Sequence, residues 1–189
     1  MSDEELPAFL KELGARFSPS AVRAWKKISE VLVQKYGGDP RNITPQPLTV
    51  SEIKRRLSGF PNLRGSKLSN FYIRAMGETG LFKVEDLNEL DVPVDKQVAR
   101  FTIYTGVLRL TYGSFRGAVC SDPLRSLIQG VWRKAAKALG IAPWMLDEPM
   151  WNIGSKLCAR RKCVQCPVED LCDKTKDVRF EGGVVFWRA

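Results

Sequence analysis

The amino-acid sequence predicts an all-α protein. Helix-start and helix-stop residues recur along the 189-residue chain, and apolar residues between them repeat at helical spacing. No alternating strand pattern competes with them, although the apolar run at residues 183–187 would suit a short strand or packed coil. The length corresponds to one domain or to two small lobes that share a core.

The first predicted helix begins at Ser18 and Pro19, a capping residue followed by a proline in the first turn. Apolar residues then fall on one helical face, and Gly37 and Gly38 end the helix. The residues of this face are Val22, Trp25, Ile28 and Leu32.

Three further helices have equally clear boundaries. A capping box at residues 49–52 starts one helix, and a second helix follows the interruption at residues 59–65. A long helix extends from Asp122 and Pro123 to Gly140, with start and stop residues at its two ends. Their predicted apolar faces are Val50, Ile53, Leu57 and Phe60; Leu68, Phe71, Ala75 and Met76; and Leu124, Leu127, Ile128, Val131, Ala135 and Leu139.

The composition excludes several kinds of active site and suggests a kind of partner. The chain contains no histidine, so it cannot build a Ser-His-Asp triad, a Cys-His pair or a His-ligated metal centre by itself. Its formal net charge of +9 favours a polyanionic partner, most simply nucleic acid. The basic excess lies in residues 41–80 (seven basic, two acidic) and 121–189 (twelve basic, eight acidic). Solvated charged faces on an ordinary basic enzyme are the alternative interpretation.

The N-terminal sequence does not have the layout of a secretory signal. Residues 1–5 are acidic instead of basic, and no apolar run approaches the ~20 residues that a membrane span needs. We therefore expect a soluble, cytoplasmic protein with no membrane partner.

Four of the five cysteines lie within fifteen residues, with the spacing C-x4-C-x2-C-x5-C: Cys158, Cys163, Cys166 and Cys172. In a reducing compartment such a cluster indicates a metal site more often than disulfides. Structural zinc usually uses two C-x2-C pairs separated by a longer spacer, whereas this loop has one. Four cysteines in one short loop, with Pro167 after the third, favour a 4Fe–4S cluster. Zinc is the second candidate, and a loop without metal is the third.

Residues 57–70 form a predicted hairpin between two helices. Pro61 ends the first helix, and Asn62 and Gly65 can adopt positive φ in a tight turn. The backbone N–H groups at the start of the next helix would then be available to a phosphate. Farther along, Asp95 occupies the N-cap position of another helix, directly after the apolar Val94.

The chain resembles the helix-hairpin-helix/Gly-Pro-Asp (HhH-GPD) superfamily of base-excision DNA glycosylases, in its endonuclease III-like branch, because these features occur in the same order in that family. The resemblance consists of the hairpin at residues 60–70, the motif Val94-Asp95-x-x-Val98-x-Arg100 and the C-terminal four-cysteine loop. It covers roughly residues 49–172. The stretch at residues 93–95 is also similar to archaeal 8-oxoguanine glycosylases of that superfamily.

The resemblance implies the site residues and the reaction. The segment at residues 65–70 matches the family segment that holds a Schiff-base lysine, which is Lys67 here. Its neutral amine would attack the sugar C1′, and the resulting imine would permit strand cleavage by β-elimination. The motif makes Asp95 the carboxylate that stabilises the positive charge on the sugar. The four cysteines become ligands of a 4Fe–4S cluster.

The resemblance also implies a two-lobed, all-α helix-hairpin-helix DNA glycosylase fold, a layout of the chain and a DNA-binding surface. We expect N-terminal helices in residues 1–48, fewer than the family usually has, and the hairpin and catalytic aspartate in 49–120. Further helices would occupy 121–157, the iron–sulfur loop 158–172 and a tail 173–189. We expect a monomer that binds double-stranded DNA with a damaged base or an abasic site. The predicted DNA contacts are Asn62, Arg64, Gly65, Ser66, Arg160, Arg161 and Lys162.

Each assignment has a simpler alternative. Lys67 could be a surface lysine near a helix start, and Asp95 could be only a helix cap. The protein as a whole could be a non-catalytic iron–sulfur DNA-binding protein, because its N-terminal part is short. A monofunctional glycosylase lies between these two hypotheses, and a redox carrier is more distant.

Overall fold

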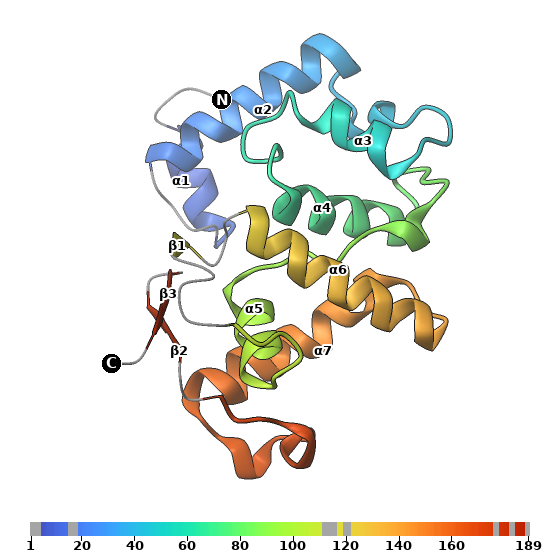
Figure 1. Ribbon diagram of the computed structural model, residues 1–189. Coiled ribbons are helices and arrows are strands. Elements are labelled where there is room, and N and C mark those ends of the chain that lie inside the picture. Colours follow the sequence, from blue (N-terminus) through green and yellow to red (C-terminus); the bar gives the residue numbers. More distant parts are fainter. Residues whose placement is uncertain are drawn as a thin grey trace. The chain divides into compact units, whose positions relative to one another are not determined.

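The computed structural model describes residues 5–14, 19–110, 117–118, 122–175, 178–181 and 184–187. The chain divides into two compact units, Met1–Asp86 and Leu87–Ala189. Seven α-helices lie in the described residues and carry most of the structure, which confirms the helical class (Figure 1). No helix in the described ranges is long and apolar enough to cross a bilayer.

The first unit contains α1 (Glu5–Glu12), α2 (Pro19–Tyr36), α3 (Val50–Leu57) and α4 (Ser66–Glu78), with a 3-10 turn at Pro40–Ile43. The predicted capping box at the start of α3 is present, because Thr49 and Glu52 each accept a hydrogen bond from the other's backbone N–H. The unit's core comes from all four helices and their connections: Leu6, Leu10, Val31, Ile43, Leu48, Val50, Ile53, Leu57, Phe60, Ile73 and Phe82.

Two predicted apolar faces in this unit are wrong in part. In α2 the buried residue is Val31, whereas Trp25 is 44% exposed. In α4 the buried residues are Ser69, Asn70 and Ile73. Leu68 and Phe71, expected in the core, are 43% and 50% exposed. The helical spacing is right in both cases, but spacing alone does not say which side of a helix its neighbours cover.

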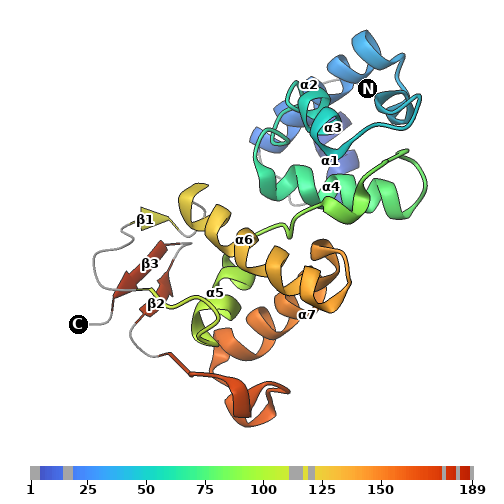
Figure 2. The same cartoon turned by 45° about the vertical axis from the view of Figure 1, so that its right-hand side comes forward.

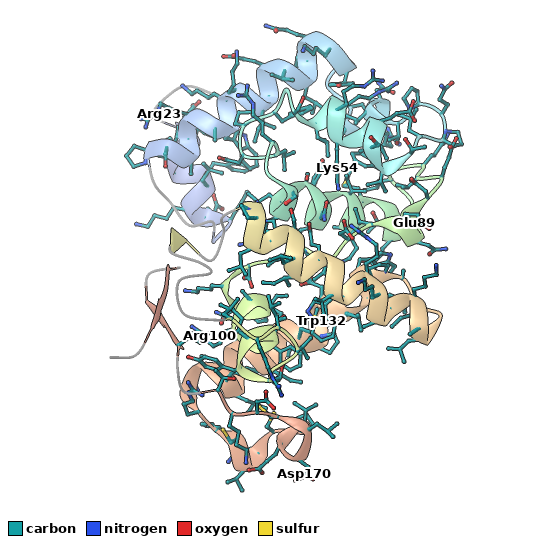
Figure 3. All side chains as sticks on the ribbon, in the orientation of Figure 1. Arg23, Lys54, Glu89, Arg100, Trp132 and Asp170 are labelled. Atoms are coloured by element: carbon teal, nitrogen blue, oxygen red, sulfur yellow. The ribbon has the colours of Figure 1, made fainter. Side chains whose placement is uncertain are left out.

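The second unit is built around α5 (Lys96–Tyr104), which packs against α7 (Asp147–Asn152) and α6 (Asp122–Leu139). Between α5 and α6 the rings of Phe101 and Trp132 stack at 5.9 Å, and Trp132 Nε1 donates to Thr102 Oγ1 at 2.9 Å. Figure 3 labels Trp132 on α6. The buried core includes Val92, Val94, Val98, Ala99, Ile103, Leu124, Ile128 and Met150. The predicted long helix has the expected ends, and Gly140 follows it with a φ of 67°.

After α7 the chain continues as a π-helical turn at Ile153–Leu157 and then as 3-10 turns at Cys158–Arg160, Cys163–Gln165 and Glu169–Leu171. Two more 3-10 turns lie at Leu87–Glu89 and Pro143–Leu146. Three of these 3-10 turns lie within the cysteine loop, which contains no longer helix and no strand.

A small antiparallel sheet completes the second unit. Strands β1 (Gly117–Ala118), β2 (Val178–Glu181) and β3 (Val184–Trp187) pair in the order β1-β3-β2, with Phe180 opposite Val185 (Figure 2). The strand interpretation of residues 183–187 is therefore confirmed for Val184–Trp187. The all-α prediction missed the two partner strands, because a two-residue strand has no periodicity and β1 pairs with a segment far along the chain.

Candidate active site and cysteine loop

The hairpin between α3 and α4 has the predicted left-handed residue at one of two positions. Asn62 has a φ of 66°, which an asparagine tolerates better than most residues. Gly65 has an ordinary φ of −83° and is the N-cap of α4, so the prediction of positive φ there is wrong. A side chain added at Gly65 would meet no atom within 4 Å. Neither the backbone conformation of Gly65 nor contact with other protein atoms requires a glycine at this position, and the space beside its backbone is open.

Lys67 is the second residue of α4 and is partly buried. The first turn of α4 carries no acidic residue and no side-chain cap. A lysine this close to a helix N-terminus is not favoured by the helix dipole, so helix stability does not explain its position. Just before it, Arg64 Nε donates to the backbone oxygen of Ser58 at 3.0 Å, which braces the hairpin.

Asp95 is the N-cap of α5, as predicted. Its Oδ1 accepts hydrogen bonds from the backbone N–H groups of Gln97 at 2.7 Å and Val98 at 3.1 Å. Its second oxygen is used differently, because Oδ2 accepts a hydrogen bond of 3.2 Å from the indole Nε1 of Trp151 on α7. The side chain is partly exposed, so the carboxylate is held at both oxygens while still reachable from solvent.

Trp151 was missed by the sequence reasoning. It lies 56 residues from Asp95, and it is 43% exposed. Its exposure is no distinguishing signal, since Trp25 is 44% exposed too; the hydrogen bond to Asp95 is what singles it out, and only the structure provides that contact. A second unpredicted contact starts one turn into α5 at Arg100, which Figure 3 labels. Arg100 donates to Gln97 Oε1 and, at 3.3 Å, to the backbone oxygen of Gly154.

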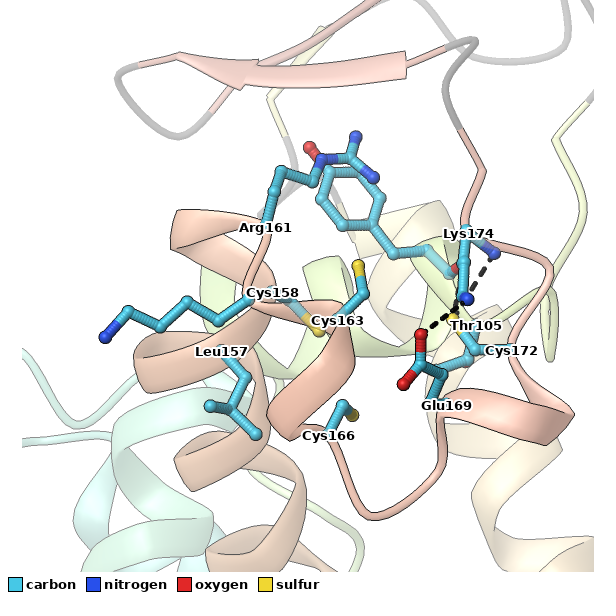
Figure 4. Close-up of a pocket in the computed structure, with 11 residues that line it drawn as sticks. Thr105, Leu157, Cys158, Arg161, Cys163, Cys166, Glu169, Cys172 and Lys174 are labelled. Atoms are coloured by element: carbon cyan, nitrogen blue, oxygen red, sulfur yellow. Dashed lines mark hydrogen bonds and ion pairs between the residues drawn. The ribbon is translucent and has the colours of Figure 1, made fainter.

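The four predicted metal ligands lie around one pocket of the second unit. Cys158, Cys163, Cys166 and Cys172 all line it, together with Arg161 and Lys174 (Figure 4). None of the four forms a disulfide. In the described part of the chain no group of three or more Cys, Asp or Glu side chains is arranged at metal-binding distances.

The chemistry of this pocket nevertheless suits an anionic cluster. Burial, and after it the negative charges of the other three cysteines, raises the pKa of the Cys158 thiol to about 11, whereas Arg100 lowers it. Cys158 is thus close enough to feel the charge of the other three cysteines as thiolates, and a bound metal relieves such repulsion. Cys172 Sγ also accepts a hydrogen bond from the backbone N–H of Lys174 at 3.3 Å, of the kind that stabilises a sulfur ligand.

The predicted basic DNA contacts of the loop separate into two kinds. Arg160 and Lys162 are exposed, as a phosphate ligand must be. Arg161 is half-buried, and its guanidinium lies over the ring of Tyr104 at 3.8 Å from the centroid. In the hairpin, Asn62, Arg64 and Gly65 are exposed.

The four cysteines therefore line one pocket. The hairpin residues Asn62, Arg64 and Gly65 lie in the turn that leads into α4, where Lys67 is the second residue. Lys67 belongs to the first unit and Asp95 to the second. The fifth cysteine, Cys120, lies outside the described residues.

Comparison with known proteins gives one family. Residues 66–179, more than half of the chain, match the family AGOG: N-glycosylase/DNA lyase. The matched segment begins at the N-terminus of α4 and includes Lys67, Asp95 and all four loop cysteines. No curated protein and no solved structure matches the chain. The chain belongs to the AGOG family of N-glycosylase/DNA lyases.

Proposed function

We propose that this N-glycosylase/DNA lyase removes a damaged base from double-stranded DNA through a Schiff base at Lys67. The observation that carries the proposal is the family match across residues 66–179, which contains the lysine, the aspartate and the cysteine loop in one segment. The matched activity needs an amine nucleophile for its lyase step, and the chain has no histidine to act as a base.

The role of Lys67 follows from the chemistry of the two steps. Its amine, in the neutral form, attacks C1′ of the damaged nucleotide as the bond to the base breaks. The covalent imine then acidifies the 2′ proton, and loss of that proton expels the 3′ phosphate by β-elimination. Phe71 supports this role because it is one turn further along α4 and is 50% exposed, with the guanidinium of Arg74 over its ring at 5.5 Å from the centroid. An aromatic ring next to a cation suits a base taken out of the stack.

The role of Asp95 is electrostatic. Positive charge develops on the sugar as the base leaves, and an ionised carboxylate stabilises it. The two backbone hydrogen bonds to Oδ1 and the Trp151 hydrogen bond to Oδ2 hold this carboxylate in one orientation before the reaction. A fixed charge of this kind needs no reorganisation at the moment of bond breaking.

DNA binding is assigned to two surfaces, one in each unit. In the first unit the open space beside Gly65 lets a phosphate approach the start of α4, where Ser66 and Arg64 add a hydroxyl and a cation. In the second unit the exposed Arg160 and Lys162 contact the backbone without reading its sequence. We expect the protein to act as a monomer.

The cysteine loop is proposed to hold a 4Fe–4S cluster, with zinc as the alternative. Cys158, Cys163, Cys166 and Cys172 would be its ligands, and the N–H of Lys174 supports the last of them. When bound, the cluster would supply a rigid cross-link of the loop and a redox centre. The loop residues themselves position Arg160 and Lys162 at the surface, and no step of base release uses the cluster.

Borohydride trapping tests the nucleophile. Wild-type protein and Lys67→Ala are incubated with duplexes that carry 8-oxoguanine, uracil, an oxidised pyrimidine or an abasic site. Lys134→Ala, at an exposed lysine of α6, is the matched control. We expect a covalent adduct with wild type and Lys134→Ala and none with Lys67→Ala. Trapping by Lys67→Ala would refute the assignment, and base release by wild type without any adduct would identify a monofunctional glycosylase.

A further inference from the structure

The side chain of Arg161 turns inward, unlike those of its two neighbours. Arg160 and Lys162 are exposed, whereas Arg161 is half-buried; Arg161 and Lys162 both line the cysteine pocket, and Arg160 does not. The cause lies in the backbone, because Arg161 has φ 52° and ψ 35° at the end of the turn Cys158–Arg160. This left-handed conformation is unfavourable for a residue with a side chain, so the surrounding structure must hold it there.

Two contacts fix the inward position. The guanidinium carbon lies 3.8 Å from the centre of the Tyr104 ring, a close cation–π contact with the last residue of α5. NH1 donates a hydrogen bond of 3.0 Å to the backbone oxygen of Thr175, in the segment after the last cysteine. Figure 4 shows Arg161 on the same side of the pocket as Cys158 and Cys163, with Glu169, Cys172 and Lys174 on the other side of the view.

The second terminal nitrogen of Arg161 has no acceptor. Its NH2 is buried and makes no hydrogen bond within the described residues. A buried guanidinium N–H without a partner is costly, and native proteins rarely leave one. Besides the four cysteine sulfurs, the pocket lining contains the side-chain oxygens of Tyr104, Thr105 and Glu169. Glu169 accepts a hydrogen bond from Lys174 and lies away from Arg161 in Figure 4, whereas Cys158 and Cys163 lie on the side of Arg161, so sulfur is the acceptor that we assign.

We propose that Arg161 is a positioning residue for the iron–sulfur cluster, donating from NH2 to a sulfur and offsetting part of the cluster's negative charge. In this role Arg161 does not bind a DNA phosphate, whereas Arg160 and Lys162 do. The inference rests on the cofactor proposed above. A 4Fe–4S cluster with four thiolates is anionic, and nearby charge and hydrogen bonds to its sulfurs set its reduction potential. Removal of this cation lowers the potential and weakens cluster retention.

The test compares four full-length proteins reconstituted with ferrous iron and sulfide under anaerobic conditions: wild type, Arg161→Gln, Arg161→Lys and Arg160→Gln. Each is measured for iron per chain, rate of iron release to a chelator, reduction potential, and affinity for duplex DNA as a function of salt. We expect Arg161→Gln to release iron about tenfold to a hundredfold faster, as loss of an outer-shell partner commonly does. Its potential falls, and its DNA affinity stays within about twofold of wild type.

The other two variants separate charge, geometry and DNA contact. Arg161→Lys keeps the charge but not the planar fork, so its potential stays near wild type while iron release is intermediate. Arg160→Gln keeps its iron and potential but binds DNA more weakly, with a smaller salt dependence. The potential is read only from molecules that hold a cluster, so a merely loosened loop does not move it.

Two outcomes overturn the inference in distinguishable ways. If Arg161→Gln holds iron like wild type and loses DNA affinity as Arg160→Gln does, the assignment of Arg161 is wrong and the cofactor stands. If the wild-type chain takes up no iron and sulfide, the cofactor and the role of Arg161 fall together. Borohydride trapping by Lys67 is independent of both results.

Discussion

The indole Nε1 of Trp151 donates a hydrogen bond of 3.2 Å to Oδ2 of Asp95, the carboxylate oxygen that does not cap α5. The two oxygens of one side chain thus serve two purposes. Oδ1 stabilises the helix, and Oδ2 is held by a residue from a different helix, α7. Asp95 therefore has a contact beyond its capping hydrogen bonds, and the two kinds of contact can be separated by mutation.

Replacement of Trp151 by phenylalanine keeps an aromatic ring on α7 and removes the N–H donor. A hydrogen bond to a charged group contributes about 1.5–3 kcal/mol, and partial exposure puts this one at the low end. We expect single-turnover base release to slow roughly tenfold, with unchanged DNA affinity. An unchanged rate of base release would show that Trp151 does not position Asp95.

Replacement of Asp95 by asparagine separates capping from catalysis. Asparagine caps helices about as well as aspartate, so the free energy of unfolding in denaturant should change little. Base release should fall by about two to three orders of magnitude, because the fixed negative charge is lost. Asp95→Ala is the companion variant, and it should lose activity and also about 1 kcal/mol of stability. Equal activity of wild type and Asp95→Asn would leave Asp95 with only its structural role.

Replacement of Gly65 by alanine tests the open space in the hairpin. Gly65 has ordinary φ and an added Cβ meets nothing, but alanine is a poorer N-cap than glycine, so stability should fall by no more than about 1 kcal/mol. Duplex affinity should fall, because the methyl group keeps a phosphate from the backbone. Gly38→Ala is the control: its φ of 82° predicts lower stability with unchanged DNA affinity. The reverse pattern would remove the hairpin from the DNA-binding surface.

Replacement of Gly154 by alanine should destabilise the second unit. The added Cβ would lie 2.2 Å from the backbone oxygen of Gln97 in the first turn of α5, which neither backbone can accommodate without moving. Overpacking of this kind costs about 1–3 kcal/mol, measurable as a lower midpoint in urea. Gly130→Ala, in the middle of α6 with no atom near its Cβ, should instead raise stability by about 0.5–1 kcal/mol. Similar midpoints for the two variants would contradict the close packing at Gly154.

Local signals predicted the parts of the fold and site that depend on adjacent residues. The capping box at Thr49, the left-handed Asn62, the cap at Asp95 and both ends of α6 are of this kind. Each of these features depends on residues within about one turn of one another, so both interacting residues can be recognised in the sequence.

The parts that failed depend on contacts between distant segments. Phe71 has the spacing of a core residue but is half exposed, because the neighbouring elements cover the other side of α4. The pairing of β1 with β3 and the hydrogen bond from Trp151 to Asp95 join positions far apart in the sequence. The inward turn of Arg161 could not be distinguished from the outward turn of Arg160, since both are arginines in one basic run.

The nine-residue helix α5 is fastened at both ends to parts of the chain that follow it. Near its start Gly154 packs on Gln97, and at its end the backbone N–H groups of Asp173 and Thr175 donate to Thr105 and Tyr104. The cysteine loop lies between these two attachments. It cannot be treated as a detachable appendage, since a chain cut after Cys172 would lose the second attachment as well as the tail. A truncated chain that ends within the cysteine loop would therefore disturb α5, the helix that Asp95 caps.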